Sequence, residues 1–280
     1  MVKYTTKDGL LMHGILSKSR EDNQTVIITI FGMTSSFFSS SWINELIKTA
    51  QRTSIDVLSA NNRGAGSVFP FKSDEHSRFI GTARERFEDC IYDISAAIDV
   101  AEKLKYKRII LAGHSTGCQK ATYYMSKTHD KRVNGIILLA PVDDYNSTRN
   151  ELGNRFNEAV KIAKAMVEHG KGERQTPEWI SYYTARRFLS YAEKSNTEAK
   201  IFNYESKMEE FASVRCPILA VFGSKEEHAP KNVNQMLSTL EKRTKSRSFK
   251  KVLMKGTGHQ FIGKRKALAK TMLEWASKIK

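Results

Sequence analysis

Residues 113–117 read Gly-His-Ser-Thr-Gly and form a G-x-S-x-G motif, which can present Ser115 as a nucleophile. An apolar segment, residues 107–114, precedes the serine, and a helical segment that continues through Tyr124 follows it. A serine in such a strand-to-helix turn is exposed at the tip, and the glycines let neighbouring backbones pass without a Cβ collision. Because a serine hydroxyl is a weak nucleophile at neutral pH, the motif predicts a nearby general base.

His259 is the predicted general base for Ser115. It lies between the last expected strand and the last expected helix, in a loop that could reach the carboxyl edge of a sheet. Of the seven histidines, only His228 and His259 follow residue 213, and serine, acid, histidine is the chain order usual for this motif. His114 is adjacent to the serine, but its side chain should point away from the tip of the turn, so we interpret it as structural.

The acid that orients the imidazole should follow the strand expected over residues 216–223. The usual pattern there is Gly-x-x-Asp, and this sequence has Gly-x-x-Glu, which points to Glu226. A glutamate can orient an imidazole and stabilise the imidazolium as an aspartate does. Two alternatives stay open: the neighbouring Glu227, and the pair Asp143 and Asp144 after an earlier strand.

A tetrahedral intermediate on the serine needs two backbone N–H groups aimed at its oxyanion. One belongs to Thr116, the residue after the nucleophile, and the other is predicted to be that of Met33 in the loop after the apolar run 25–31. A histidine usually precedes the glycine of that loop, and here the residue is Phe31. Since the donors are backbone groups, this change should affect the anchoring of the loop more than the oxyanion site.

Apolar strands alternate with helical stretches along most of the chain, which predicts a mostly parallel, doubly wound sheet covered on both faces. After an N-terminal hairpin, the expected strands span residues 25–31, 55–61, 107–114, 133–142, 216–223 and 248–256. Besides the helix after Ser115, the expected helices of this part span residues 42–51, 82–104, 231–242 and 264–278. A loop is expected over residues 64–78.

The alternation stops over about 70 residues between two of the strands. We therefore predict a core formed by residues 1–143 and 214–280, with residues 144–213 inserted as a helical cap, or lid. One cap helix is expected over residues 152–169. A second is expected over residues 176–191, with Thr-Pro at its start as N-cap and first helical residue.

Residues 145–211 contain ten of the 27 aromatic residues of the chain. A cap over the carboxyl edge of a sheet is a usual place for an apolar substrate pocket, so Trp179, Tyr183 and Phe188 are candidate substrate contacts. They would suit esters with apolar or aromatic groups. The alternative is that these rings form the cap's own core, as the helical spacing of Phe188 and Tyr191 suggests.

The net charge of +16 is concentrated near the C-terminus, where residues 241–280 hold thirteen Lys or Arg and two Glu. Residues 144–213, by contrast, hold eleven of each sign. The basic residues are not interleaved with stacking aromatic residues, so we interpret them as a solvated face. Such a face could attract polyanions without specificity, and no specific nucleic-acid partner is expected.

Several other classes of protein are disfavoured by what the sequence lacks. No window approaches the roughly 18 consecutive apolar residues of a membrane span, and the first residues do not read as a secretory signal. Cys90, Cys118 and Cys216 are not in a C-x-x-C motif, and we expect reduced thiols in a cytoplasmic protein. Without a clustered His/Cys/Asp set, a P-loop or G-x-G-x-x-G, neither a metal nor another cofactor is expected.

Over nearly its whole length the chain resembles the α/β-hydrolase superfamily of serine hydrolases. Residues 62–67, Asn-Arg-Gly-Ala-Gly-Ser, are similar to the Asp-x-Arg-Gly-x-Gly-x-Ser loop of many members. The segments GHSTGCQKATYY and VNGIILLAPVDD, and the acidic pair before Pro230, resemble a branch that includes siderophore-ester hydrolases. The chain departs from that branch at Lys120, where the branch has aspartate, and at Glu226, where aspartate is usual.

The resemblance implies the α/β-hydrolase fold and a Ser-acid-His esterase that acts on a small or medium ester. A thioesterase, peptidase or acyltransferase would use the same residues. The alternative of another class is a catalytically silent binding protein with this fold. The presence of both Ser115 and His259 argues against that alternative.

Overall fold

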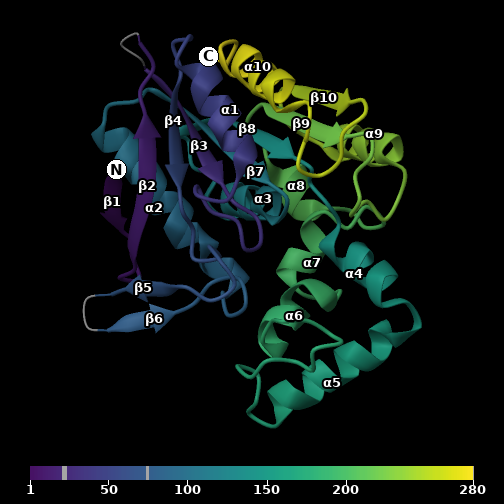
Figure 1. Cartoon of the computed structure of the whole chain (residues 1–280). Coiled ribbons are helices and arrows are strands. Elements are labelled where there is room, and N and C mark those ends of the chain that lie inside the picture. The colour runs from purple at the N-terminus through teal and green to yellow at the C-terminus, as the bar shows by residue number, and fades with distance from the viewer. Residues whose placement is uncertain (21–23, 74–75, 280) are drawn as a thin grey trace.

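An eight-stranded sheet forms the centre of the molecule, with the strand order β1-β2-β4-β3-β7-β8-β9-β10 (Figure 1). The computed structural model describes residues 1–20, 24–73 and 76–279. The strands are β1 (Val2–Thr5), β2 (Leu11–Ser17), β3 (Thr25–Ile30), β4 (Asp56–Ala60), β7 (Arg108–His114), β8 (Val133–Leu139), β9 (Ile218–Gly223) and β10 (Phe249–Met254). Strands β1 and β2 form the predicted antiparallel hairpin, and all pairings from β4 to β10 are parallel.

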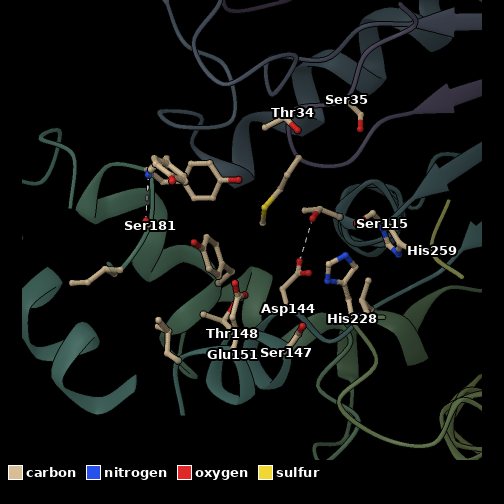
Figure 2. A pocket seen from close by; sticks show the side chains of 18 of the residues that line it. Thr34, Ser35, Ser115, Asp144, Ser147, Thr148, Glu151, Ser181, His228 and His259 are labelled. Atoms are coloured by element: carbon tan, nitrogen blue, oxygen red, sulfur yellow. Dashed lines mark hydrogen bonds between the residues drawn. The ribbon is translucent and has the colours of Figure 1, made fainter. Parts of the chain in front are cut away.

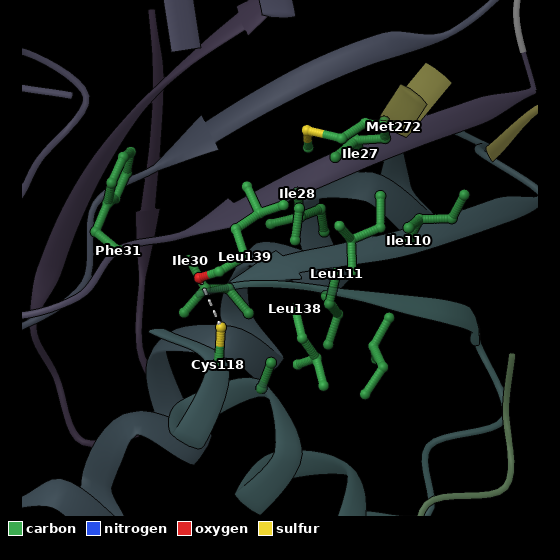
Figure 3. Packing of buried hydrophobic residues seen from close by; sticks show 14 of the residues in the cluster. Ile27, Ile28, Ile30, Phe31, Ile110, Leu111, Cys118, Leu138, Leu139 and Met272 are labelled. Carbon is green, nitrogen blue, oxygen red and sulfur yellow. Dashed lines mark hydrogen bonds between the residues drawn. The ribbon is translucent and has the colours of Figure 1, made fainter. Parts of the chain in front are cut away.

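Helices cover both faces of this sheet, which explains why its central strands are continuous apolar runs. On one side lie α1 (Ser41–Ala50) and α10 (Arg265–Ala276), and on the other α2 (Cys90–Lys103) and α3 (Thr116–Thr128) (Figure 1). Figure 3 shows the same division, with Met272 of α10 and Cys118 of α3 on opposite sides of the strands. Helix α9 (Val233–Arg243) packs on β9 and β10. The predicted fold class is therefore confirmed.

The helix predicted from residue 82 begins later, with the short 3-10 turn η1 (Phe87–Asp89) that leads into α2. The residues before it bind other loops instead of forming a helical turn. Thr82 Oγ1 donates to the carbonyl of Gly64 and accepts the N–H of Thr34, both at 2.5 Å. The preceding loop, predicted to be irregular, contains the two-stranded ribbon of β5 (Pro70–Lys72) and β6 (Ser77–Phe79).

Between β8 and β9 the chain forms five helices, and the first four lie together below the sheet in Figure 1. They are α4 (Asp144–Leu152), α5 (Phe156–Glu168), α6 (Ala185–Ala192), α7 (Thr197–Ile201) and α8 (Glu209–Ser213), with the 3-10 turn η2 (Gly153–Arg155) between the first two. The helix predicted from Thr176 starts at Ala185, because Thr184 is the residue whose hydroxyl caps the helix, accepting the N–H of Arg187 at 3.3 Å. Thr176 instead donates to the carbonyl of Ser181 within a loop.

This insertion packs in two different ways. Helices α5 and α6 share a small hydrophobic core of their own, which includes Phe156, Phe188 and Tyr191. Side chains of α7 and α8, such as Ile201 and Phe211, belong instead to the main core beneath the sheet. The insertion is thus held to the sheet layer by apolar contacts along its second half.

A buried network of four charged side chains also joins the insertion to the sheet layer. Lys120 of α3 binds Glu85 at 2.6 Å, and Arg187 of α6 binds Glu198 of α7 through two contacts of 2.5 and 2.9 Å. A longer contact of 3.5 Å between Arg187 and Glu85 connects the two pairs. All four side chains are fully buried. Because buried charges are tolerated only when paired, the two bases and two acids require one another.

None of the described helices combines the length and the apolar composition needed to cross a bilayer. The three cysteines are free thiols: Cys90 and Cys118 are buried, and Cys216 is half-buried. Burial raises the pKa of Cys216 to about 11, which keeps this thiol protonated at neutral pH.

We predict that Lys120→Met lowers the free energy of unfolding by about 3–5 kcal/mol, because it leaves the Glu85 carboxylate buried without its closest cation. Urea unfolding followed by circular dichroism measures this change. Lys103→Met, at an exposed position of α2, is the matched control and should change stability by less than about 0.5 kcal/mol. Equal stability of the two variants would contradict the prediction.

Candidate active site

Ser115 occupies the sharp turn between β7 and α3, as predicted. Its backbone has φ of 56° and ψ of −132°, a strained conformation for a residue with a side chain. Glycines make the turn possible, because a Cβ atom on Gly117 would overlap the carbonyl oxygen of Ile30. One on Gly113 would overlap the carbonyl of Gly117. The turn therefore requires glycine at both ends of the motif.

The loop after β3 passes directly against this turn, since β3 and β7 are neighbouring parallel strands. A Cβ atom on Gly32 would lie 2.9 Å from Ser115 Cβ and 3.2 Å from the backbone nitrogen of Thr116. The N–H of Met33 makes no hydrogen bond within the described residues. Thr116 is the first residue of α3, whose N–H has no acceptor inside the helix. The structure thus brings the two predicted oxyanion donors to the same turn.

Two asparagines anchor the loop that carries Met33. The side chain of Asn62 donates to the carbonyl of Phe31 at 2.8 Å, and that of Asn61 accepts the N–H of Phe37 at 3.1 Å. Phe31, which stands where a histidine is usual, is completely buried in the main core. The loop is therefore held by its backbone and by an apolar side chain.

Strands β9 and β10 bring Glu226 and His259 together. They pair in parallel, with Gly223 opposite Met254, so the loops after them leave the sheet side by side. Glu226 Oε1 lies 2.7 Å from His259 Nδ1, and the Glu226 side chain is fully buried. With Nδ1–H donating to the carboxylate, the opposite ring nitrogen, Nε2, is the one that can accept a proton.

The other predicted acids have different partners. Glu227 accepts the backbone N–H of His259 at 2.6 Å. Burial raises the pKa of this glutamate, but that hydrogen bond, a second one from its own backbone N–H and the nearby histidines together lower it. Asp143 caps α4 by accepting the N–H of Asn146 at 2.9 Å. Asp144 accepts from the Gln119 side chain at 2.7 Å. Within the described residues, only Glu226 hydrogen-bonds to the His259 imidazole.

His114 has a contact that sequence reasoning missed when it interpreted this residue as structural. Its Nε2–H donates to the carbonyl oxygen of His259 at 3.0 Å. Burial, followed by the nearby His259, lowers the pKa of His114 to about 3, so the ring is neutral at physiological pH. Since the ring pins the His259 loop to β7, it is a positioning residue. Its place in the motif was visible in the sequence, but its partner 145 residues away was not.

Ser115 and His259 line one pocket, with a volume of about 540 Å³, between the sheet edge and the insertion (Figure 2). Trp179 and Tyr183 line it from the insertion. Phe188 is not among the lining residues, because its side chain is buried in the core shared by α5 and α6. Trp179 and Tyr183 thus lie where substrate contacts were predicted, whereas Phe188 belongs to the insertion's own core.

His228 is a further lining residue that the sequence did not single out for this role. Its ring stands nearly perpendicular to that of His259, with 4.8 Å between the ring centres. No hydrogen bond joins the Ser115 hydroxyl to the His259 imidazole among the described residues.

Comparison with protein families gives one match. The model of the family described as "Protein of unknown function (DUF1749)" matches residues 15–276. A search of the curated proteins found no match.

Solved structures share the architecture at low sequence identity. The siderophore hydrolase EstB from Aspergillus fumigatus is 16% identical with a TM-score of 0.74, covering 100% of this chain and 98% of that one. Est1E from Butyrivibrio proteoclasticus, with ferulic acid bound, is 17% identical with a TM-score of 0.70 and 99% coverage of both chains. The α/β hydrolase GrgF from Penicillium sp. sh18 is 16% identical with a TM-score of 0.71, covering 99% and 97%. The fold is that of the α/β hydrolases.

Replacing each of the adjacent glutamates by glutamine separates their roles. Glu226→Gln should slow covalent labelling of Ser115 by a fluorophosphonate probe by about 10³-fold or more, because an amide can hold the imidazole in the wrong tautomer. Glu227→Gln keeps an acceptor for the His259 N–H and should slow labelling by less than about tenfold. A larger loss in Glu227→Gln than in Glu226→Gln would reverse the assignment.

Proposed function

The chain belongs to the family described as protein of unknown function (DUF1749), and we propose that it is a serine hydrolase that cleaves carboxylic esters. The observation that carries this proposal is the meeting, in one pocket, of a strained serine turn and an imidazole bound to a buried carboxylate. A binding protein would need neither the backbone strain at Ser115 nor the buried Glu226 beside His259.

In the proposed reaction Ser115 Oγ attacks the ester carbonyl carbon while its proton passes to His259 Nε2. Glu226 stabilises the imidazolium that forms. The N–H groups of Met33 and Thr116 bind the oxyanion, and collapse of the tetrahedral intermediate releases the alcohol, which takes the proton from His259. Water, deprotonated by His259, then attacks the acyl-serine, and the acid leaves as the serine recovers its proton.

The known proteins with this fold support a small-molecule ester as the substrate. One is described as a siderophore hydrolase, one holds ferulic acid, and one is a carboxyl esterase from Bacillus coagulans, 13% identical with a TM-score of 0.70. We further propose that residues 144–213 act as a cap that forms the far wall of the substrate pocket. The lining side chains Trp179 and Tyr183 support this role.

Ser115→Ala should abolish both fluorophosphonate labelling and hydrolysis of p-nitrophenyl esters, because no other nucleophile is aligned with His259 in the mechanism above. Ser147→Ala, which changes another lining serine, is the matched control and should keep both activities. A panel of aryl esters and matched thioesters, assayed with the wild-type protein, distinguishes an esterase from a thioesterase. Labelling that persists in Ser115→Ala would refute the proposed nucleophile.

Trp179→Ala should alter selectivity for acyl chain length, since it removes a large apolar surface from the pocket wall. We expect the ratio of kcat/KM for octanoate over butanoate p-nitrophenyl esters to change by about tenfold. Phe79→Ala, at an exposed position of β6 outside the pocket, serves as the control. If Trp179→Ala leaves the ratio as it is in wild type, the ring belongs only to the packing of the insertion.

A further inference from the structure

The charge of the pocket is opposite to that of the chain. The lining residues include three acids, Asp144, Glu151 and Glu178, and none of the described lining residues is a lysine or an arginine. The whole chain nevertheless carries a net charge of +16. Glu151 and Glu178 are exposed at the rim and form no ion pair with a described residue. Figure 2 shows Glu151 and Asp144 among the side chains around the cavity.

Asp144 differs from the buried carboxylates Asp93, Glu85 and Glu198 because no described lysine or arginine forms an ion pair with it. Asp143 is likewise bound by neutral donors only, but it is not among the residues that line the pocket. The Oδ2 atom of Asp144 accepts hydrogen bonds from neutral groups only, Gln119 Nε2 at 2.7 Å and Thr116 Oγ1 at 3.3 Å. By contrast, Asp93 lies 2.8 Å from Arg63. Glu85 and Glu198 likewise each contact a buried base. A carboxyl group that is half-buried in a cavity wall without a counter-ion can be neutralised by a cationic ligand.

The electrostatic surroundings of Asp144 make its ionisation depend on a nearby positive charge. Burial, with the nearby Glu198 and Asp143 adding to it, raises the pKa of Asp144 to about 8. Arg187 lowers this pKa, but its guanidinium is already bound to Glu198 through two contacts. A bound ammonium group would supply the missing positive charge and favour the ionised carboxylate.

The position of Asp144 also indicates which part of a bound ester would carry the positive charge. Its hydrogen bond to the Thr116 side chain holds it next to the residue whose N–H faces the oxyanion in the proposed mechanism. A substituent of the acyl group, close to the scissile carbonyl, is the part of a substrate that we place within reach of Asp144. The rings of Tyr182 and Tyr183 line the same cavity, and aromatic rings attract cations. Tyr191, a third lining tyrosine, already has the Arg187 guanidinium over its ring at 5.3 Å. A neighbouring ring, Trp179, already holds the Arg155 guanidinium at 3.6 Å.

We propose that this pocket selects esters whose acyl group carries a protonated amino group, with Asp144 as its anchor. The inference builds on the proposed esterase function and names the substrate class of that same site. Glu151 and Glu178 at the rim attract the cation, the tyrosine rings surround it, and Asp144 pairs with it beside Ser115.

The test compares two esters that differ only in this charge. The benzyl ester of β-alanine and benzyl butanoate have acyl groups of the same length, with NH₃⁺ in one where the other has CH₃. At pH 8, kcat/KM should favour the amino ester by about tenfold or more in the wild-type protein. Asp144→Asn should bring this ratio close to one. Glu158→Gln, at an exposed position of α5 outside the pocket, should leave the ratio at its wild-type value.

A second measurement needs neither turnover nor a variant. Hexylammonium should protect Ser115 of the wild-type protein from a fluorophosphonate probe at a concentration about tenfold lower than 1-hexanol does. Equal protection by the two compounds, or hydrolysis of both esters without preference, would overturn the amino-ester inference and leave the esterase intact. Absence of both labelling and hydrolysis would overturn the esterase itself, and the inference with it.

Discussion

The proposed catalytic pair depends on holding one loop across the sheet. His259 follows β10, the last strand of the sheet, whereas Ser115 follows β7, and two strands lie between them. Three contacts fix His259 in this position: Glu227 binds its N–H, His114 binds its carbonyl, and Glu226 binds its ring. The backbone is thus held on both sides of the residue, and the ring is oriented separately. Nucleophile and base are consequently positioned by the sheet and its loops, independently of the helical insertion.

The position of His259 near Ser115 also requires that the buried groups around it are either neutral or paired with an opposite charge. The lowered pKa of His114 keeps its ring neutral, so it presents an N–H to the carbonyl of His259 without placing a charge beside the second imidazole. In the network around Lys120 and Arg187, the charge of each buried base is balanced by that of a buried acid. Asp144 and Asp143 are both held by neutral donors alone, but only Asp144 lines the pocket, and this position is what makes it the proposed anchor for a ligand.

The parts that were predictable from the sequence are those governed by short-range patterns. Apolar runs separated by helices predicted a parallel sheet, and the glycines around Ser115 predicted the strained turn that the structure contains. Helix starts at residues 82 and 176 were predicted wrongly because Thr82 binds another loop and Thr176 donates to Ser181 within its own loop. These partners are distant or belong to irregular segments, so no local propensity reveals them.

The Gly-x-x-Glu spacing pointed to Glu226 over the adjacent Glu227, but the contact that separates the roles of the two acids could not be predicted from the sequence. Glu226 and Glu227 have the same chemistry, and the turn of the loop alone decides which one reaches the imidazole. A Cβ atom on Gly258 would overlap the Glu227 carboxylate, so the close approach of these two loops directs Glu227 to the backbone of His259. The pairing of Lys120 with Glu85 joins residues 35 positions apart, which no pattern of spacing in the sequence predicts.

Asp144 links the helical insertion to the sheet layer. As the first residue of α4 it opens the insertion, yet its carboxylate is bound to Thr116 and Gln119 of the helix that follows the nucleophile. The near wall of the pocket is therefore part of the rigid sheet layer, whereas Trp179 and the tyrosines of the far wall belong to the insertion. Substitutions at Trp179 can then change the far wall without removing a contact that positions the proposed catalytic pair or Asp144. The proposed recognition of charge and the proposed recognition of size thus depend on different elements of one pocket.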